Sequence, residues 1–184
     1  IKYSKHKIKY SKHKIKKNMV TLVSGFWDLP QSKFDTPTYL KWFENALPIQ
    51  APMIFYLEKP DPELESLVLK CRGPYNPTQF RYRTLQDFQV LKQTQVEQFK
   101  DRTHPLHCPN IHLGGVWLEK IALVNEASHE NPFQTEWFAW YDAGMCSFRD
   151  SKPPQNCTWP NPQNMHKLKL GCLNFTHSPE WTDE

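Results

Sequence analysis

The sequence lacks the short motifs that identify several common enzyme classes. It contains no Walker phosphate loop, no Gly-x-Gly-x-x-Gly dinucleotide fingerprint and no Gly-x-Ser-x-Gly esterase elbow. These absences argue against P-loop, Rossmann-dinucleotide and common esterase functions. No apolar run approaches the roughly 20 residues that a membrane-spanning helix needs, and no hydrophobic region of a secretory signal is present. We therefore expect no transmembrane segment.

Closely spaced cysteines are also missing. The five cysteines stand far apart, are odd in number and form no Cys-x-x-Cys motif; they lie at positions 71, 108, 146, 157 and 172. This pattern favours reduced thiols over a disulfide framework, and so slightly favours a cytoplasmic location. Two N-glycosylation sequons, at Asn156 and Asn174, indicate a secretory lumen instead. The sequence leaves both compartments open.

Acidic residues are absent from the first 17 positions, which hold eight lysines and the tandem repeat IKYSKHK-IKYSKHK. We expect residues 1–18 to form a disordered basic tail outside the working domain, because Met19 directly precedes the first strand-like run. An alternative is an electrostatic module that binds nucleic acid or anionic lipid through this repeat. The rest of the chain has 15 basic and 19 acidic residues, which argues against a specific nucleic-acid-binding fold.

From Met19 onward, apolar strand-like runs alternate with helical patterns. The 39% of hydrophobic residues and the length of 184 residues suit one globular domain. Predicted strands lie at 19–25, 52–58 and within 137–144, and predicted helices at 36–47, 61–70, 85–100 and 116–127. This alternation predicts an α/β fold with a mostly parallel sheet flanked by helices. The domain should span residues 19–150, followed by an irregular, partial segment at 151–184 with a weak strand near 167–173.

Two of the predicted helices carry more specific expectations. Thr36 is a plausible N-cap of the helix at 36–47, because its hydroxyl could accept a hydrogen bond from the first turn. In the helix at 116–127, Trp117, Ile121 and Val124 recur at helical spacing. They should therefore form one apolar face.

The stretch WFAWYDAG ends a strongly apolar run in a single carboxylate. In a strand, one side would carry Trp137, Ala139 and Tyr141 and the other Phe138 and Trp140. This pattern predicts a strand buried on both faces in the middle of the sheet. Asp142 would then lie at the carboxyl end, where ligands of open α/β sheets bind. It is either a turn-former or helix cap, or a carboxylate that holds Mg²⁺ or Mn²⁺ beside a nucleotide diphosphate.

Other residues with useful chemistry lack a supporting pattern. The loop at 104–112 contains three histidines and Cys108, but their spacing matches no usual zinc site. Cys146 has no marked helix start or histidine beside it, so an idle thiol is favoured over a nucleophile. Arg81 and Arg83 lie in a polar connector or edge strand. Their guanidinium groups have the chemistry to bind a diphosphate, but we expect them to be ordinary exposed charges.

Five segments occur in order between about residues 20 and 150: TLVSGFWDL, TYLKWFENAL, PMIFYLE, VWLEKIALVNEA and NPFQTEWFAWYDAG. Together they resemble the HtrL/YibB family of glycosyltransferases, and the last segment is the most specific. The resemblance implies a GT-A-like domain that binds a nucleoside-diphosphate sugar through Mn²⁺ or Mg²⁺. It also implies transfer of the sugar to a carbohydrate or glycoconjugate acceptor.

The resemblance further implies roles for individual residues. Asp142 would hold the metal and the diphosphate in place of the Asp-x-Asp motif of GT-A enzymes. Ser24 and Gly25 would lie near the base and ribose; the alternative is that they form a simple turn. Lys120 would reach a phosphate; the alternative is a solvated lysine with no ligand.

The sequence departs from the GT-A pattern in two ways. Its DAG segment offers one carboxylate where the Asp-x-Asp motif offers two, and only about 40 residues follow the acidic strand. GT-A enzymes use that following stretch to bind the acceptor and to supply a base or a second metal ligand, so no catalytic residue is predicted here. Donor binding is therefore a firmer prediction than sugar transfer, and a non-catalytic or degenerate GT-A-like domain is an alternative.

Overall fold

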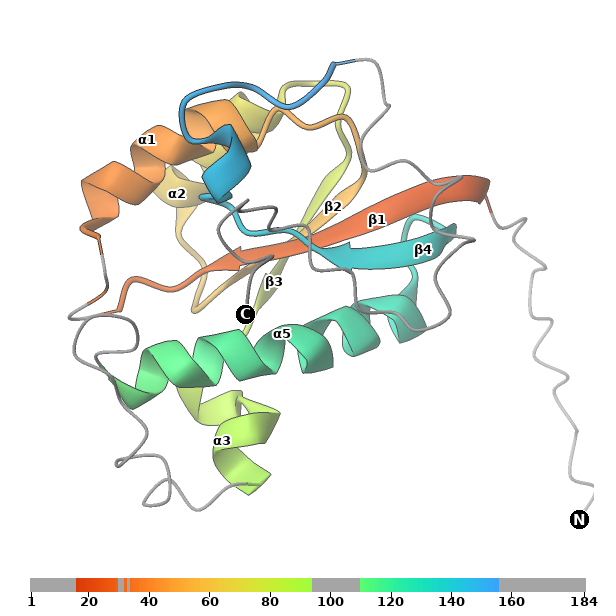
Figure 1. Cartoon of the computed structure of the whole chain (residues 1–184). Helices are drawn as coiled ribbons and strands as arrows, with labels where there is room; N and C mark the ends of the chain where they lie inside the picture. The colour runs from red at the N-terminus through yellow and green to blue at the C-terminus, as the bar shows by residue number, and fades with distance from the viewer. Residues whose placement is uncertain (1–15, 30–31, 33, 94–109, 156–184) are drawn as a thin grey trace, which may run out of the picture.

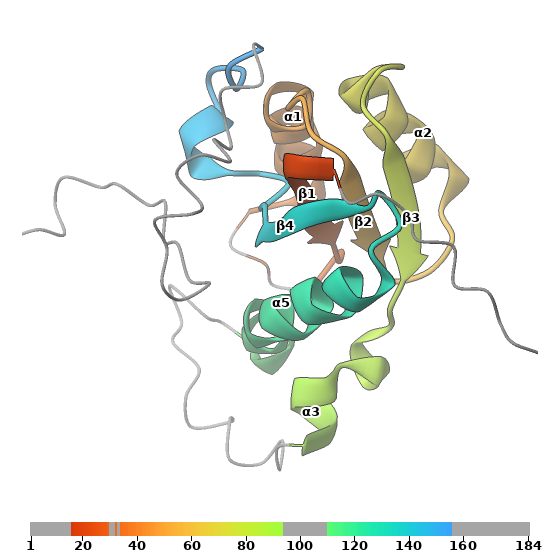
Figure 2. The same ribbon diagram turned by 90° about the vertical axis from the view of Figure 1, so that its right-hand side faces the viewer.

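A four-stranded parallel sheet forms the centre of the chain. The computed structural model describes residues 16–29, 32, 34–93 and 110–155. The strands β1 (Lys16–Phe26), β2 (Met53–Leu57), β3 (Thr78–Tyr82) and β4 (Thr135–Trp140) lie in the order β3-β2-β1-β4 (Figure 1, Figure 2). The predicted α/β class with a parallel sheet is therefore confirmed. Strand β1 begins at Lys16, so it includes the last residues of the predicted tail.

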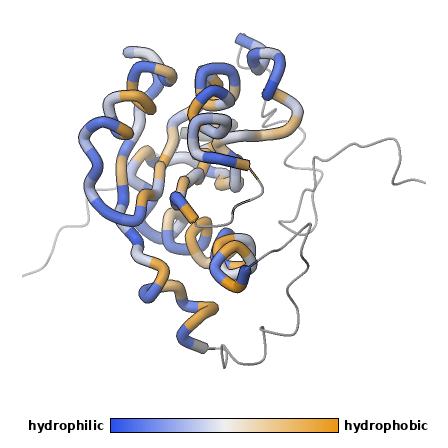
Figure 3. The backbone as a smooth tube through the Cα atoms, turned by 90° about the vertical axis from the view of Figure 1, so that its left-hand side faces the viewer, coloured by the Kyte–Doolittle hydropathy of each residue, from blue (hydrophilic) through white to orange (hydrophobic). Residues whose placement is uncertain are grey.

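Helices cover both faces of this sheet. Helices α1 (Thr36–Ala46) and α2 (Pro62–Arg72) lie on one face, and α5 (Ile111–Glu130) and the short α3 (Gln89–Gln93) lie on the other (Figure 1). Along the helices in Figure 3, hydrophobic and hydrophilic residues alternate, as expected when one side of each helix packs on a sheet. Among the described residues, no helix is both long and apolar enough to cross a membrane.

Two hydrophobic clusters, one on each face, hold the layers together. The cluster under α1 and α2 includes Leu22, Phe43, Phe55 and Val68. The cluster under α5 includes Val23, Ile54, Phe88 and Leu123. Strand β2 contributes to both and is buried along its whole length, because it is a central strand with helices above and below.

The start of α1 differs from the prediction by one residue. The N-cap is Asp35, whose carboxylate accepts a hydrogen bond of 2.9 Å from the backbone N–H of Thr38. The hydroxyl of Thr36 donates instead to Asp28 in the preceding loop. A carboxylate before Thr-Pro can therefore take the capping position that the sequence assigned to the threonine.

Helix α5 is confirmed, and Val124 packs against the cluster beneath it, but the predicted apolar face was wrong for Trp117 and Ile121. Ile121 is 79% exposed and Trp117 46% exposed, whereas Glu119 is 1% exposed and lies on the buried side. The carboxylate of Glu119 accepts hydrogen bonds from the backbone N–H groups of Gln89 and Val90, at 2.9 and 3.0 Å. These bonds satisfy the buried charge, so the helix can turn a polar residue inward.

The continuous helix predicted at 85–100 is also wrong in its described part. Residues Leu85–Asp87 form a 3₁₀ turn, η1, and α3 begins only at Gln89. Phe88 between them has φ −60° and ψ 125°, an extended conformation that interrupts the helix. Its ring is fully buried and packs edge-to-face on Trp27, with ring centroids 5.3 Å apart. Burial of this aromatic ring therefore overrides the local helical pattern.

Strand β4 does not lie in the middle of the described sheet. It pairs only with β1 among the described strands, and most of its side chains are half-buried. The predicted alternation is nevertheless confirmed. Trp137 and Ala139 pack against the cluster under α1 and α2, and Phe138 and Trp140 against the cluster under α5.

Several sequence predictions fall outside the described residues. These are most of the basic tail, most of the loop at 104–112, the weak strand at 167–173 and both sequons. Of that loop, the structure describes Asn110, which caps α5 through a hydrogen bond of 2.9 Å from Leu113 N–H, and the exposed His112.

The order of the strands fixes where a ligand site can form. The chain moves outward from β1 to β2 and β3, then returns to add β4 on the other side of β1. The chain that follows β1 therefore leads to one side of this strand, toward β2, whereas the chain that follows β3 crosses to the other side, toward β4. Open α/β sheets bind their ligands in the crevice at such a reversal, outside the carboxyl ends of the strands.

Candidate functional site

A cavity of about 280 Å³ lies at this reversal, beside the ends of β1 and β4. Its volume is close to the lower end of the range for small-molecule sites, about 300 Å³. Gly25 and Phe26 reach it from β1, Lys120 from α5, and Asp142 from the segment after β4. The structure therefore brings together residues that are far apart in the sequence.

Aromatic side chains form a large part of the cavity wall. The aromatic lining includes Phe26, Trp27, Phe34, Tyr39, Trp117 and Trp140. Burial raises the pKa of the Tyr39 phenol, which is protonated at neutral pH in any case, so its hydroxyl can donate a hydrogen bond there. Flat apolar walls with a few polar groups suit a ligand that contains an aromatic ring or a sugar.

Gly25 leaves room for the ring of Trp27, which forms part of the cavity wall. A Cβ atom at Gly25 would lie 2.7 Å from the Trp27 ring and 3.0 Å from the carbonyl oxygen of Tyr56. The ring is held by a hydrogen bond of 2.9 Å from its indole N–H to the carbonyl of Arg83. Any larger residue at position 25 would therefore displace this part of the wall.

Asp142 stands in a turn that the neighbouring residues fix. The backbone N–H of Tyr141 continues the sheet by donating to the carbonyl of Val23, at 2.8 Å, and Met145 N–H donates to the carbonyl of Asp142, at 3.0 Å. Gly144 fits closely, because a Cβ there would lie 3.0 Å from the ring of Trp42. The alternative that Asp142 belongs to a turn is thus confirmed.

The carboxylate of Asp142 is also occupied by two donors. The ammonium of Lys120 and the indole N–H of Trp140 both donate to Oδ1, each at 2.7 Å. Lys120 lies over the Trp140 ring as well, 5.4 Å from its centroid. The Asp142 side chain is 56% exposed, and Oδ2 accepts no hydrogen bond from the described residues.

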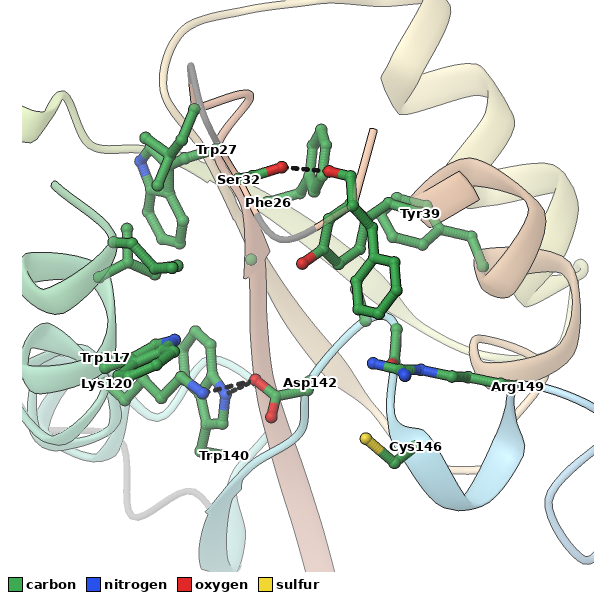
Figure 4. Close-up of a pocket in the computed structure, with 18 residues that line it drawn as sticks. Phe26, Trp27, Ser32, Tyr39, Trp117, Lys120, Trp140, Asp142, Cys146 and Arg149 are labelled. Carbon is green, nitrogen blue, oxygen red and sulfur yellow. Dashed lines mark hydrogen bonds and ion pairs between the residues drawn. The ribbon is translucent and has the colours of Figure 1, made fainter. Parts of the chain in front are cut away.

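Arg149 enters the cavity from the opposite wall (Figure 4). Its guanidinium lies 3.7 Å from the centroid of the Trp42 ring and 5.1 Å from that of Phe34. Its Nε donates to the carbonyl of Gly144 at 3.3 Å, and its own carbonyl accepts from Asn45 Nδ2 at 2.7 Å. Within the described part of the chain, the two terminal nitrogens of Arg149 have no hydrogen-bond partner and no carboxylate forms an ion pair with it.

The predicted site residues fall into two groups. Gly25, Lys120 and Asp142 line the same cavity. Ser24 does not line it; it is fully buried inside β1, and its hydroxyl has no hydrogen-bond partner among the described residues. Strand β1 continues to Phe26, so Ser24 and Gly25 do not form the turn that the sequence left open.

Arg81 and Arg83 lie away from the cavity, at the β3 edge. Arg81 is in β3 and forms an ion pair of 2.8 Å with Glu130, and Arg83 pairs with Glu126. The edge-strand alternative is therefore confirmed for Arg81. Cys146 does line the cavity as an exposed free thiol, and no histidine lines it among the described residues.

Sequence reasoning missed Arg149. The segment around it has no periodic pattern, and nothing marked this arginine apart from its position shortly after Asp142. Its place in the cavity depends on α1, which supplies the Trp42 ring from a part of the sequence more than 100 residues earlier.

The described cavity does not provide the donor set of a protein-held divalent cation. Asp142 is its only carboxylate, and the Lys120 ammonium already lies 2.7 Å from Oδ1. Mg²⁺ and Mn²⁺ favour several oxygen ligands, and a neighbouring cation opposes their binding. No group of three potential metal ligands occurs among the described residues. The metal at Asp142 stays a prediction.

Comparisons of this chain with protein-family models, curated proteins and solved structures found no match. The functional argument therefore depends on the cavity and its residues.

Proposed function

We propose that this chain is a GT-A-like domain that binds a nucleoside-diphosphate sugar and transfers the sugar to a carbohydrate or glycoconjugate acceptor. The observation that supports the proposal is the aromatic cavity at the strand reversal, with Lys120 and Arg149 on opposing walls. A nucleotide sugar carries an aromatic base, a sugar and a strongly anionic diphosphate. These three parts match the rings and cations of the cavity.

The aromatic side chains would hold the base and the sugar. Trp117 is half-exposed at the cavity and offers a ring face for stacking, which contributes about 1–3 kcal/mol for a nucleic-acid base. Trp27 is fixed by its hydrogen bond to Arg83 and could provide a second surface. Trp140 is less available, because Lys120 lies over its ring.

The cations would act on the diphosphate. During sugar transfer the bond between the anomeric carbon and a diphosphate oxygen breaks, and negative charge grows on the departing group. Charged donors that are already in place stabilise such charge, because they need little reorganisation during the reaction. Lys120 and Arg149 have the chemistry for this task.

A second candidate function is nucleotide-sugar binding without transfer. One observation favours it: the only carboxylate of the described cavity, Asp142, already accepts hydrogen bonds from Lys120 and Trp140. A general base takes the proton of the acceptor hydroxyl, and no second carboxylate or histidine lines the described cavity to do so while Asp142 holds Lys120. An assay of transfer separates the two candidates.

Isothermal titration calorimetry of the full chain with UDP-, GDP-, ADP- and CDP-sugars, with and without Mn²⁺, tests the binding proposal. We expect one nucleotide to bind, and we expect Lys120→Gln to weaken it about tenfold or more, because a hydrogen bond to a charged group contributes about 1.5–3 kcal/mol. Arg81→Gln is the matched control, because Arg81 is a cation outside the cavity. If none of these nucleotides binds to the folded protein under either condition, the proposal is wrong. If a nucleotide sugar does bind, release of its nucleotide in the presence of candidate acceptors distinguishes transfer from binding alone.

A further inference from the structure

The charges of the cavity suggest how an anionic ligand is held. We propose that the cavity binds the diphosphate of its nucleotide without a divalent metal, through Arg149 and Lys120. The inference rests on the proposed function, because it requires a nucleoside diphosphate in the cavity. It replaces the metal that the GT-A resemblance implies with two cations of the chain itself.

Arg149 is the better positioned of the two cations. The ring of Trp42 lies under its guanidinium, and the hydrogen bond from Nε to the Gly144 carbonyl fixes the plane of the group. Both terminal nitrogens are without hydrogen-bond partners among the described residues. A guanidinium held in this way can donate two parallel hydrogen bonds to one phosphate.

Lys120 supplies the second charge from the facing wall (Figure 4). Its ammonium carries three donors, and the described structure uses one of them in the bond of 2.7 Å to Asp142. The Trp140 ring and Asp142 together hold the ammonium beside the cavity. A phosphate oxygen can therefore bind Lys120 without any change in the fold.

Asp142 would act as the counter-charge of Lys120 when no ligand is bound. The charged residues that line the described cavity are Lys120, Arg149 and Asp142, so the lining carries one net positive charge. A metal-bound site and a metal-free site make opposite predictions for Asp142→Asn. Loss of a metal ligand would abolish binding, whereas loss of a nearby negative charge favours an anionic ligand.

The test is calorimetric titration of the full chain with UDP, GDP, ADP and CDP, once in excess EDTA and once with Mn²⁺. We expect the nucleotide that binds to do so in EDTA, with a dissociation constant within about threefold of that in Mn²⁺. In EDTA, Arg149→Gln should weaken binding about tenfold or more, and Arg149→Lys should restore only part of the loss. Asp142→Asn should bind as tightly as the wild type or more tightly. Arg81→Gln is again the control.

Each remaining outcome has a distinct meaning. Binding that requires Mn²⁺ and disappears in Asp142→Asn would overturn the metal-free inference and leave the proposed function standing. Binding in EDTA that Arg149→Gln and Lys120→Gln leave unchanged would overturn the assignment of these two cations. Absence of binding by all four nucleotides under both conditions, in a protein that melts cooperatively, would overturn the proposed function together with the inference. Because Lys120 is partly exposed, Lys120→Gln keeps the test valid if Arg149→Gln folds poorly.

Discussion

Two arginines of this molecule have the same chemistry and opposite surroundings. Arg72, at the end of α2, is 1% exposed and donates to the backbone carbonyls of Leu47, Ile49 and Ala51 and to the hydroxyl of Thr78. Arg149, on the cavity wall, donates within the described structure only from Nε, to a carbonyl.

The difference separates a structural site from a candidate binding site. Arg72 holds the loop that leads into β2 with its two terminal nitrogens and the start of β3 with Nε, so no guanidinium nitrogen is left for a ligand. No described residue binds either terminal nitrogen of Arg149, which lies beside an open cavity. Hydrogen-bond saturation therefore distinguishes the two arginines more clearly than residue type does.

The largest expected effect comes from replacing each arginine by methionine, which keeps much of the apolar volume. Arg72→Met should lower the free energy of unfolding by about 3–5 kcal/mol, because it leaves several buried carbonyls without donors. Arg149→Met should change it by less than about 1 kcal/mol and should instead weaken nucleotide binding. Urea unfolding measures the first quantity and calorimetric titration the second.

This comparison fails if the two variants behave alike. A loss of stability in Arg149→Met as large as that in Arg72→Met would make Arg149 a structural residue. A folded Arg72→Met variant with unchanged stability would show that water or a rearranged loop satisfies the carbonyls.

A second prediction concerns alkaline pH and Tyr141, which extends the network around Arg72. Its hydroxyl donates to the carbonyl of Ala46, next to the carbonyls that Arg72 binds. Burial raises the pKa of Tyr141 in the folded protein above its ordinary value of 10.0. The folded state therefore retains this proton when the unfolded state loses it, so the stabilisation is complete below pH 10 and declines as the pH rises further.

Urea unfolding at about pH 9 and about pH 11 measures this effect. Tyr141→Phe should be less stable at the lower pH by about 1 kcal/mol, because it loses the hydrogen bond. Above pH 10, the free energy of unfolding of Tyr141→Phe should also fall less steeply than that of the wild type. The difference in slope should be about 1.4 kcal/mol for each pH unit. Tyr75→Phe is the control, because Tyr75 is 93% exposed. Equal slopes in Tyr141→Phe and the wild type would contradict the prediction.

The sequence predicted the α/β class because its signals are local. Alternating apolar runs, and an aspartate with a proline at the start of α2, mark elements without reference to distant residues. The buried face of α5 was missed for the opposite reason. Glu119 can be buried only because the backbone N–H groups of Gln89 and Val90 reach it, and a periodic pattern does not contain that information.

The same limit applies to the candidate site. Asp142 was identified because it follows an apolar strand, and the structure brings Gly25 and Lys120 to the same cavity. Arg149 was missed, because the ring against which it packs belongs to Trp42, on a helix from the other end of the domain. Residues fixed by their own strand can be predicted from sequence, whereas a residue fixed by tertiary contacts needs the structure.

The smallest expected effect tests whether the Trp42 ring orients Arg149. Trp42→Leu removes the ring face 3.7 Å from the guanidinium and should weaken nucleotide binding about two- to fivefold, whereas Trp42→Phe should lose less, because it keeps an aromatic face. Titrating Trp42→Leu, Arg149→Gln and the double variant completes a double-mutant cycle. If the ring acts through Arg149, Trp42→Leu should have no further effect once Arg149 is replaced. Additive losses of binding free energy would mean that Trp42 contributes to binding independently of Arg149. The hydrogen bond from Nε to the Gly144 carbonyl would then be the main contact that orients the Arg149 guanidinium.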